Sequence, residues 1–157
     1  MVTGAGLIGI YASGDSPSSG VAGTLACEDK VPAEQRSAIY RDSGVNPTHD
    51  KELDALPVYP GCVKVNDPVT NGAGSFAAFW ATAGPTEAAS FYLEELPPLG
   101  WEETGGPMTV VGTGGEPHTL LTFNKGVLSL TVDVYENPSK GGEYGNLSVL
   151  FRLQNIQ

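Results

Sequence analysis

The residues of this chain that could act as acids, bases or nucleophiles are few and scattered. The 157-residue sequence holds two histidines: His49 lies in a polar segment, and His118 opens an apolar alternating run. A hydrolytic triad needs a nucleophile beside such a histidine, and the G-x-S-x-G turn that would present one does not occur in the sequence. We therefore expect no catalytic residues.

Two pairs of adjacent glutamates, Glu94-Glu95 and Glu102-Glu103, are the remaining candidates for acid–base chemistry. Glycoside cleavage requires two carboxylates that face each other across the bond to be broken. Adjacent residues of one helix or strand point in different directions. We therefore interpret both pairs as solvent-exposed charge.

The sequence also offers no set of metal or phosphate ligands. Two cysteines and two separated histidines do not make a zinc site, and an alternating Asp/Asn calcium loop is not present in the sequence. The glycine-rich stretches NGAGS and VGTGGEP lack the lysine of a phosphate-binding loop and are expected to be turns. We expect neither a metal nor a cofactor.

The two cysteines, Cys27 and Cys62, suggest a disulfide. An even cysteine count makes pairing the default in an exported chain. Two alternatives stay open: the cysteines are unrelated thiols, or Cys27 is lipidated, because TLAC at 24–27 is similar to a lipoprotein processing box. A lipidated Cys27 would anchor the chain to a membrane and could not pair.

Composition and charge bound the setting and the partners. The formal net charge is −10, and an acidic surface repels nucleic-acid phosphates and anionic membranes. The chain has 21 glycines and 12 prolines but few lysines, a composition more usual in secreted proteins. The apolar run at 6–12 is too short to span a membrane. We expect an extracytoplasmic protein with protein partners, no nucleic acid and no membrane span.

The distribution of glycine, proline and charge divides the chain into three parts. Residues 1–26 are rich in Gly, Ser and Ala and are expected to be an N-terminal arm, either a signal remnant or an assembly segment. Residues 27–55 are expected to be a polar linker with a short helix at 32–40. Residues 56–157 are expected to form the compact domain.

Hydrophobic periodicity predicts one principal helix and several strands in that domain. We expect a helix at about 85–96, a three-residue hairpin at 124–126, and strands at 75–82, 108–111, 118–123, 127–135 and 147–153. The last two strands alternate apolar and polar residues, so one sheet face is dry and the helix covers it. The expected fold class is α+β, an antiparallel sheet of about five to six strands with the helix on one face, plus the extended arm.

The stretch FYLEELPPLGW at 91–101 is expected to be a structural joint. Phe91, Tyr92 and Leu96 share one helix face, the prolines after them end the helix, and the glycine permits a sharp return. Aromatic residues at helical spacing belong to the core in most proteins. The expected core is built on Tyr59, Phe91, Tyr92, Leu96 and Trp101.

Three motifs carry a resemblance to known sequences: LPVYPGCVKV at 56–65, SFAAFWAT at 75–82, and the pattern FY-x3-L-x3-GW at 91–101. With these motifs, residues 56–154 resemble a family of uncharacterised bacterial and archaeal exported proteins and lipoproteins. The resemblance implies a fold and a cell-surface setting, and it implies no activity. Cys62 departs from the pattern, which has a small residue there.

Two functions from different classes are compatible with these observations. The first is a non-catalytic extracytoplasmic domain for attachment or protein–protein assembly, as a surface or filament subunit. It would self-assemble through residues 4–22, which would add a strand to the sheet edge of a neighbour. The alternative is a small-molecule-binding domain or an enzyme with a pocket between helix and sheet, suggested by the aromatic residues.

Overall fold

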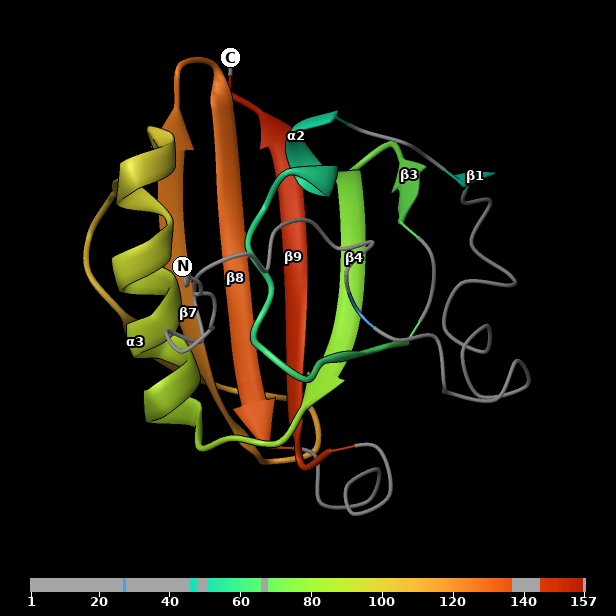
Figure 1. The fold of residues 1–157 in the computed structure, drawn as a ribbon, viewed down its shortest axis with the longest axis vertical. Coiled ribbons are helices and arrows are strands. Elements are labelled where there is room, and N and C mark those ends of the chain that lie inside the picture. The colour runs from blue at the N-terminus through green and yellow to red at the C-terminus, as the bar shows by residue number, and fades with distance from the viewer. Residues whose placement is uncertain (1–26, 28–45, 48–50, 66–67, 137–144, 157) are drawn as a thin grey trace, which may run out of the picture.

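An antiparallel sheet with helical cover on one face dominates the structure (Figure 1). The computed structural model describes residue 27 and residues 46–47, 51–65, 68–136 and 145–156. Its elements are β1 (Asn46–Pro47), α2 (Lys51–Asp54), β2 (Val63–Lys64), β3 (Val69–Asn71), β4 (Gly74–Ala81), α3 (Pro85–Glu95), the 3-10 helix η3 (Pro97–Leu99), β5 (Glu102–Glu103), β6 (Met108–Val111), β7 (Pro117–Lys125), β8 (Leu128–Glu136) and β9 (Leu147–Asn155).

The sheet contains nine described strands, and all of their pairings are antiparallel. The strand order is β1-β3-β4-β9-β8-β7-β5, with β2 also pairing with β4 and β6 also pairing with β7. The expected number of five to six strands was therefore too low. The strands β1, β2 and β5 have 2 residues each, which is too short for an alternating pattern to reveal them.

The long strands bury one face of the sheet by alternation. On β8, Leu130, Val132 and Val134 are fully buried, and the residues between them point to the other side. The neighbouring strands continue this core face with Ala77, Phe79 and Ala81 on β4, Leu121 and Phe123 on β7, and Leu147, Val149, Phe151 and Leu153 on β9. The dry face expected from the alternation is the core face of the sheet.

Helix α3 covers the β7–β8 side of the core face (Figure 1). Pro85 lies in the first turn, where its missing N–H removes no helical hydrogen bond. Glu87 Oε2 accepts a hydrogen bond from the Gly84 N–H at 3.5 Å, which caps the helix start. Ala88 and Tyr92, one turn apart, are fully buried against the sheet. The helix expected at about 85–96 is therefore present.

The chain after α3 is a tight joint. The 3-10 helix η3 follows directly, and Gly100 then adopts a φ of 91°, a left-handed conformation that glycine takes without strain. The turn returns Trp101 to the core, where it is 2% exposed. Lys125 Nζ lies 5.6 Å from the centre of the Trp101 ring, so the joint also contacts the end of β7.

A second segment, residues 51–62, covers the β4–β9 side of the core face (Figure 1). It begins with α2, and its Leu53, Leu56 and Val58 belong to the same buried cluster as the sheet residues. Glu52 Oε2 accepts a hydrogen bond from Lys125 Nζ at 3.2 Å, which joins α2 to β7. Leu53 lies in the stretch expected to be a linker, so the core begins before residue 56.

The opposite face of the sheet holds a smaller cluster beside β4. Val63, Val65 and Trp80 are buried there, with Ala78 packed against them. Val63 and Trp80 pair directly across β2 and β4. Towards β7 and β8 this face becomes polar, and the cluster described below lies at that end.

The β7–β8 hairpin differs from the expected one. Lys125 pairs with Leu128, so the loop has the two residues 126–127 rather than three at 124–126. Gly126 has a φ of 61°, the positive value that such two-residue turns require.

Several expectations fall outside the described residues: the helix at 32–40, the arm at 1–26 with its segment 4–22, and His49. Within the part of the chain that the structure describes, no helix is long and apolar enough to cross a membrane.

Candidate functional site

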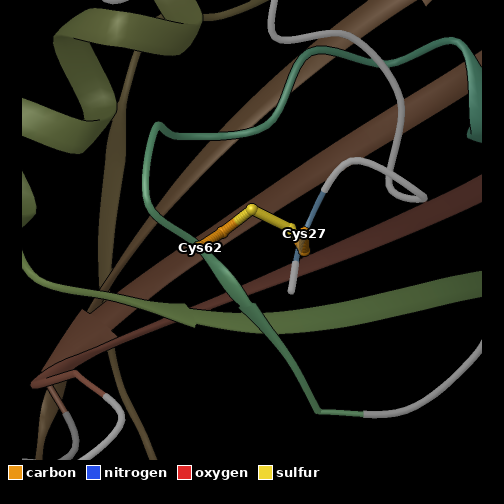
Figure 2. Close-up of a disulfide and its surroundings, with 2 residues drawn as sticks. All are labelled: Cys27 and Cys62. Atoms are coloured by element: carbon orange, nitrogen blue, oxygen red, sulfur yellow. A yellow bond between two sulfur atoms is a disulfide. The ribbon is translucent and has the colours of Figure 1, made fainter. Parts of the chain in front are cut away.

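The two cysteines are joined to each other. Cys27 and Cys62 form a disulfide with an S–S distance of 1.98 Å and a Cα–Cα distance of 5.0 Å (Figure 2). Both side chains belong to the main core cluster, and Cys62 directly precedes β2. The bond therefore ties residue 27 to the segment that covers the core face. A disulfide is consistent with an extracytoplasmic setting.

The aromatic residues expected in the core form a series of edge-to-face contacts from segment 51–62 through α3 to β9. Ring centres are 5.2 Å apart for Tyr59 and Phe91, 5.0 Å for Phe91 and Tyr92, and 5.6 Å for Tyr92 and Phe151. Tyr92 is fully buried, whereas Tyr59 and Phe91 are half-buried and pack on the rim of the core. These two rim residues pack against the buried cluster where the covering elements meet solvent.

Side chains fill the contact between α3 and the sheet. Tyr92, Leu96 and Phe151 are each 0% exposed. A hollow of about 710 Å³ lies elsewhere, where the β3–β4 turn meets the ends of β8 and β9, and it is lined mainly by polar residues such as Asn71 and Arg152. No residue of α3 lines this hollow, so it is not the pocket between helix and sheet that the alternative function requires.

The hydroxyl groups of Tyr59 and Tyr92 both have raised pKa values. The Tyr59 hydroxyl donates a hydrogen bond to Glu87 Oε1 at 2.6 Å. Burial, followed by this bond and the Glu87 charge, raises the pKa of Tyr59 to about 12. Burial raises the pKa of Tyr92 well above its ordinary value, although a backbone group of Tyr59 close to its hydroxyl opposes the rise. Both side chains stay neutral at physiological pH and serve packing.

A polar cluster lies on the opposite sheet face, where the β6–β7 hairpin meets β8. His118 Nδ1 is 2.8 Å from Asp133 Oδ1 and 3.0 Å from Asp133 Oδ2, and His118 Nε2 is 3.2 Å from Glu116 Oε1. The Tyr135 ring stacks on His118, with ring centres 4.0 Å apart and planes inclined by 15°. We call these four residues the His118 cluster. The strand register builds it, because His118 pairs with Tyr135 and lies diagonal to Asp133.

The two carboxylates of the cluster have different environments. Burial raises the pKa of Asp133, although the hydrogen bond and charge of His118 oppose the rise. The backbone N–H of Glu116 itself, followed by the hydrogen bond from His118, lowers the pKa of Glu116. The surroundings of the cluster thus shift the pKa values of its two carboxylates in opposite directions.

The loop between β6 and β7 packs closely on the cluster. A Cβ atom at Gly112 would collide with His118 Nε2 and would lie 2.8 Å from Glu116 Oε1. A Cβ atom at Gly114 would lie 2.7 Å from Glu116 Oε2. The Gly112 N–H donates to the Glu116 carbonyl at 2.8 Å and closes the loop. The stretch VGTGGEP is thus the expected turn, and its glycines permit the contact with His118.

The geometry of the cluster does not match a hydrolytic site. A catalytic histidine places one ring nitrogen against an acid and the other against a nucleophile. In His118 both ring nitrogens face carboxylates. Nor do the described residues include three His, Cys, Asp or Glu side chains placed to hold a metal ion. The cluster instead braces the β6–β7 loop against β8.

The outer edge of β6, residues 108–111, is the second notable feature. β6 pairs with β7 on one side, and no described strand lies on its other side. Met108 is 59% exposed and Val111 is 74% exposed. Along an antiparallel ladder, residue pairs that exchange backbone hydrogen bonds alternate with pairs that do not. The hydrogen bond from the Gly112 N–H to the Glu116 carbonyl makes Gly112–Glu116 a bonded pair, so Val111–Pro117 and Thr109–Thr119 are non-bonded pairs. The N–H and C=O groups of Thr109 and Val111 therefore point away from β7.

The glutamate pairs behave as surface charge. Glu102 and Glu103 are exposed on β5, while on α3 Glu94 is exposed and Glu95 half-buried.

Sequence reasoning placed His118 at a strand start but did not predict its contact with Asp133. The signal that could have done so is the two-residue turn at Gly126, because that turn determines which residue of β8 lies opposite His118.

Comparison with known proteins finds no family model, no curated protein and no solved structure that matches this chain. The fold itself therefore defines the class: a disulfide-bonded domain whose described residues form a nine-stranded antiparallel sheet with helices on its core face. The resemblance of residues 56–154 to exported proteins and lipoproteins stays an inference from motifs.

Proposed function

We propose that this chain is a non-catalytic extracytoplasmic domain that assembles with other protein chains, and that the outer edge of β6 is its assembly surface. The exposure of this edge carries the proposal: the backbone groups of Thr109 and Val111 point outward, and Met108 and Val111 are largely exposed. An unpaired strand edge is a template for an added strand. Sheets usually protect such edges with charge or proline, and β6 itself has neither.

The proposed occupant is the segment 4–22 of a second copy. It contains GLIGIYA at 6–12, an uncharged and largely apolar run. As an extended strand, this run would supply backbone hydrogen bonds and alternate side chains along the edge. The arm of one copy and the edge of the next are different surfaces, so the contact is head-to-tail and can continue into a filament. Such an arrangement suits a surface or filament subunit.

Three further observations support this proposal over the alternative of a ligand pocket. The disulfide is compatible with an oxidising compartment, and the resemblance to exported proteins and lipoproteins points to the same setting. The contact between α3 and the sheet is filled by buried side chains. Both ring nitrogens of His118 are engaged by carboxylates.

The variant Thr109→Pro tests the assembly surface. Because the Thr109 N–H points outward, proline removes a donor that an added strand needs but no hydrogen bond to β7. Thr109→Ala keeps the donor and is the matched control. In size-exclusion chromatography with light scattering, we expect full-length wild type and T109A to form oligomers and T109P to be monomeric with an unchanged unfolding midpoint. An excess of a synthetic 4–22 peptide should dissociate the oligomers. Identical sizes for T109P and wild type would overturn the proposal.

A further inference from the structure

The hollow beside the β3–β4 turn is a feature that the proposed assembly does not use. It has a volume of about 710 Å³, and its lining comes from residues 70–75 and from the ends of β8 and β9. None of the residues that line it belongs to β6 or β7. The hollow and the proposed assembly surface are therefore separate parts of the described structure.

One position of the sheet within this hollow has no side chain. Gly74 on β4 pairs with Asn71 on β3 and lies beside Gln154 on β9. A Cβ atom at Gly74 would collide with the carbonyl oxygen of Leu153 and would lie 3.4 Å from the Gln154 Cβ. The middle of the row therefore stays open, with an amide side chain on each side of the gap.

The Asn71 amide is held in place with its donor end free. Its Oδ1 accepts a hydrogen bond from the Ala73 N–H at 2.7 Å, which orients the amide group. Among the described residues, nothing accepts a hydrogen bond from its Nδ2. The Gln154 side chain across the gap is exposed. An amide both donates and accepts hydrogen bonds, as a hydroxyl does, so these two side chains suit a ligand rich in hydroxyls.

Arg152 gives the hollow a positive charge. Its neighbours across the strands are Phe76 on β4 and Thr131 on β8, both uncharged, and it shares a sheet face with Gln154 two positions away. Within the described part of the chain, no side chain pairs with its guanidinium. The chain has 18 acidic residues, yet no Asp or Glu is among the residues that line the hollow. The guanidinium is therefore available to an external carboxylate, which it can bind through two parallel hydrogen bonds.

These groups together define the class of ligand. One guanidinium matches the single charge of one carboxylate, whereas a phosphate carries nearly two charges. The lining contains no aromatic ring, and its large apolar residues are Leu128 and Leu153, of which Leu153 is buried. Such a surface gives little apolar contact to the side chains of a peptide. A small acid rich in hydroxyls fits it better.

We propose that the hollow beside the β3–β4 turn binds a sugar acid: the Arg152 guanidinium pairs with the carboxylate, and the amides of Asn71 and Gln154 hydrogen-bond to the hydroxyls. This site is carried by other observations than those for assembly. It belongs to the single chain, whether or not the chain assembles.

Saturation-transfer NMR on the full chain tests the site, because it detects a weakly bound ligand on a monomer or an oligomer alike. The probes are glucuronate, neutral glucose and acetate, at fixed pH and ionic strength. With wild type we expect saturation transfer to glucuronate. The dissociation constants of glucose and acetate should be at least about tenfold higher, because glucose lacks the carboxylate and acetate lacks the hydroxyls.

Variants of the lining identify the contacts. In Arg152→Gln, which removes the charge from an exposed position, the affinity for glucuronate should fall about tenfold with an unchanged unfolding midpoint. Lys64→Gln is the matched control, because it removes the same charge from β2, whose residues do not line the hollow, and it should bind glucuronate as wild type does. Asn71→Asp keeps the acceptor for the Ala73 N–H but adds a carboxylate to the hollow, so it should also bind glucuronate more weakly.

The outcomes separate this site from its alternatives and from the assembly. Equal affinity of R152Q and wild type for glucuronate, or no saturation transfer to glucuronate, would overturn the site. Glucose that binds as tightly as glucuronate would refute the role of the carboxylate, and acetate that does so would refute the role of the hydroxyls. Tighter binding of the acidic peptide tri-glutamate, lost in R152Q, would reject the sugar acid as the ligand. T109P should bind glucuronate as wild type does, so a failure of the assembly proposal leaves this test valid.

Discussion

At the scale of single residues, Glu87 connects two parts of the fold with one carboxylate. One oxygen accepts a hydrogen bond from the Gly84 N–H at the start of α3, and the other accepts one from the Tyr59 hydroxyl. The first contact caps the helix, and the second ties the helix start to the segment that covers the rest of the core face. Hydrogen bonds to a charged acceptor are stronger than neutral ones, so this pair is a sensitive reporter of the joint.

The titration of Tyr59 makes this contact measurable. Its phenolate should form at a pKa of about 12, two units above the ordinary tyrosine value of 10.0. The folded chain then binds its proton more tightly between pH 10 and 12, so the free energy of unfolding falls as pH rises through this window. Ultraviolet titration checks the value, with Tyr59→Phe identifying the signal. Glu87→Gln should lower the midpoint but leave it above 10, because burial is the largest cause. A wild-type midpoint near 10 for Tyr59 would contradict the hydrogen bond.

At the scale of elements, the length of a helix or strand determines whether the sequence can predict it. The helix α3 and the strands β4, β6, β7, β8 and β9 lie within a few residues of their expected positions, because each shows its own periodicity. β1, β2 and β5 have 2 residues each and exist through pairing with longer neighbours. No local pattern reveals such strands, so the sheet is wider than expected.

The His118 cluster shows how one turn controls a site. With Lys125 opposite Leu128, the register places His118 opposite Tyr135. The expected three-residue loop at 124–126 would instead place His118 opposite Val132, a shift of three positions. An odd shift exchanges the two faces of a strand, so His118 would have met a core residue. The polar cluster can therefore be predicted only when the turn is assigned as the two-residue loop 126–127.

The β3–β4 turn offers a prediction with an internal control. Gly74 has a φ of 132°, and a Cβ atom there would collide with the backbone oxygen of Leu153 on β9. Gly72 in the same turn has no atom within 4 Å of such a Cβ and no positive φ. Gly74→Ala should therefore cost about 1–3 kcal/mol from the backbone strain, with the collision adding to it. Gly72→Ala should change stability by less than about 0.5 kcal/mol. Urea unfolding measures both, and equal midpoints for the two variants would contradict the close approach of the turn to β9.

At the scale of the whole molecule, the two covers of the core face are held in different ways. α3 has 11 residues and a buried face of its own. Segment 51–62 contains a single helical turn, α2 with 4 residues, which is too short to be stable alone. It depends on burial of Leu53, Leu56 and Val58, on the contact from Lys125 to Glu52, and on the disulfide at Cys62. We infer that this cover is the part of the core most dependent on the disulfide.

Removing the disulfide should therefore release this cover first. Cys27 and Cys62 are separated by 35 positions, and closing a loop of that length stabilises a protein by about 4 kcal/mol on the chain-entropy model. That is a large share of the roughly 5–15 kcal/mol by which single domains are stable. We expect the double variant C27S/C62S to unfold at lower urea concentration by this free energy. Amide exchange of residues 53–58 should also quicken before that of β8.

Wild type in a reducing agent should match the variant, which separates loss of the bond from the effect of the new serines. Equal stability of the variant and the oxidised wild type would contradict this role. Free thiols in a non-reducing peptide map of the protein would contradict the bond itself.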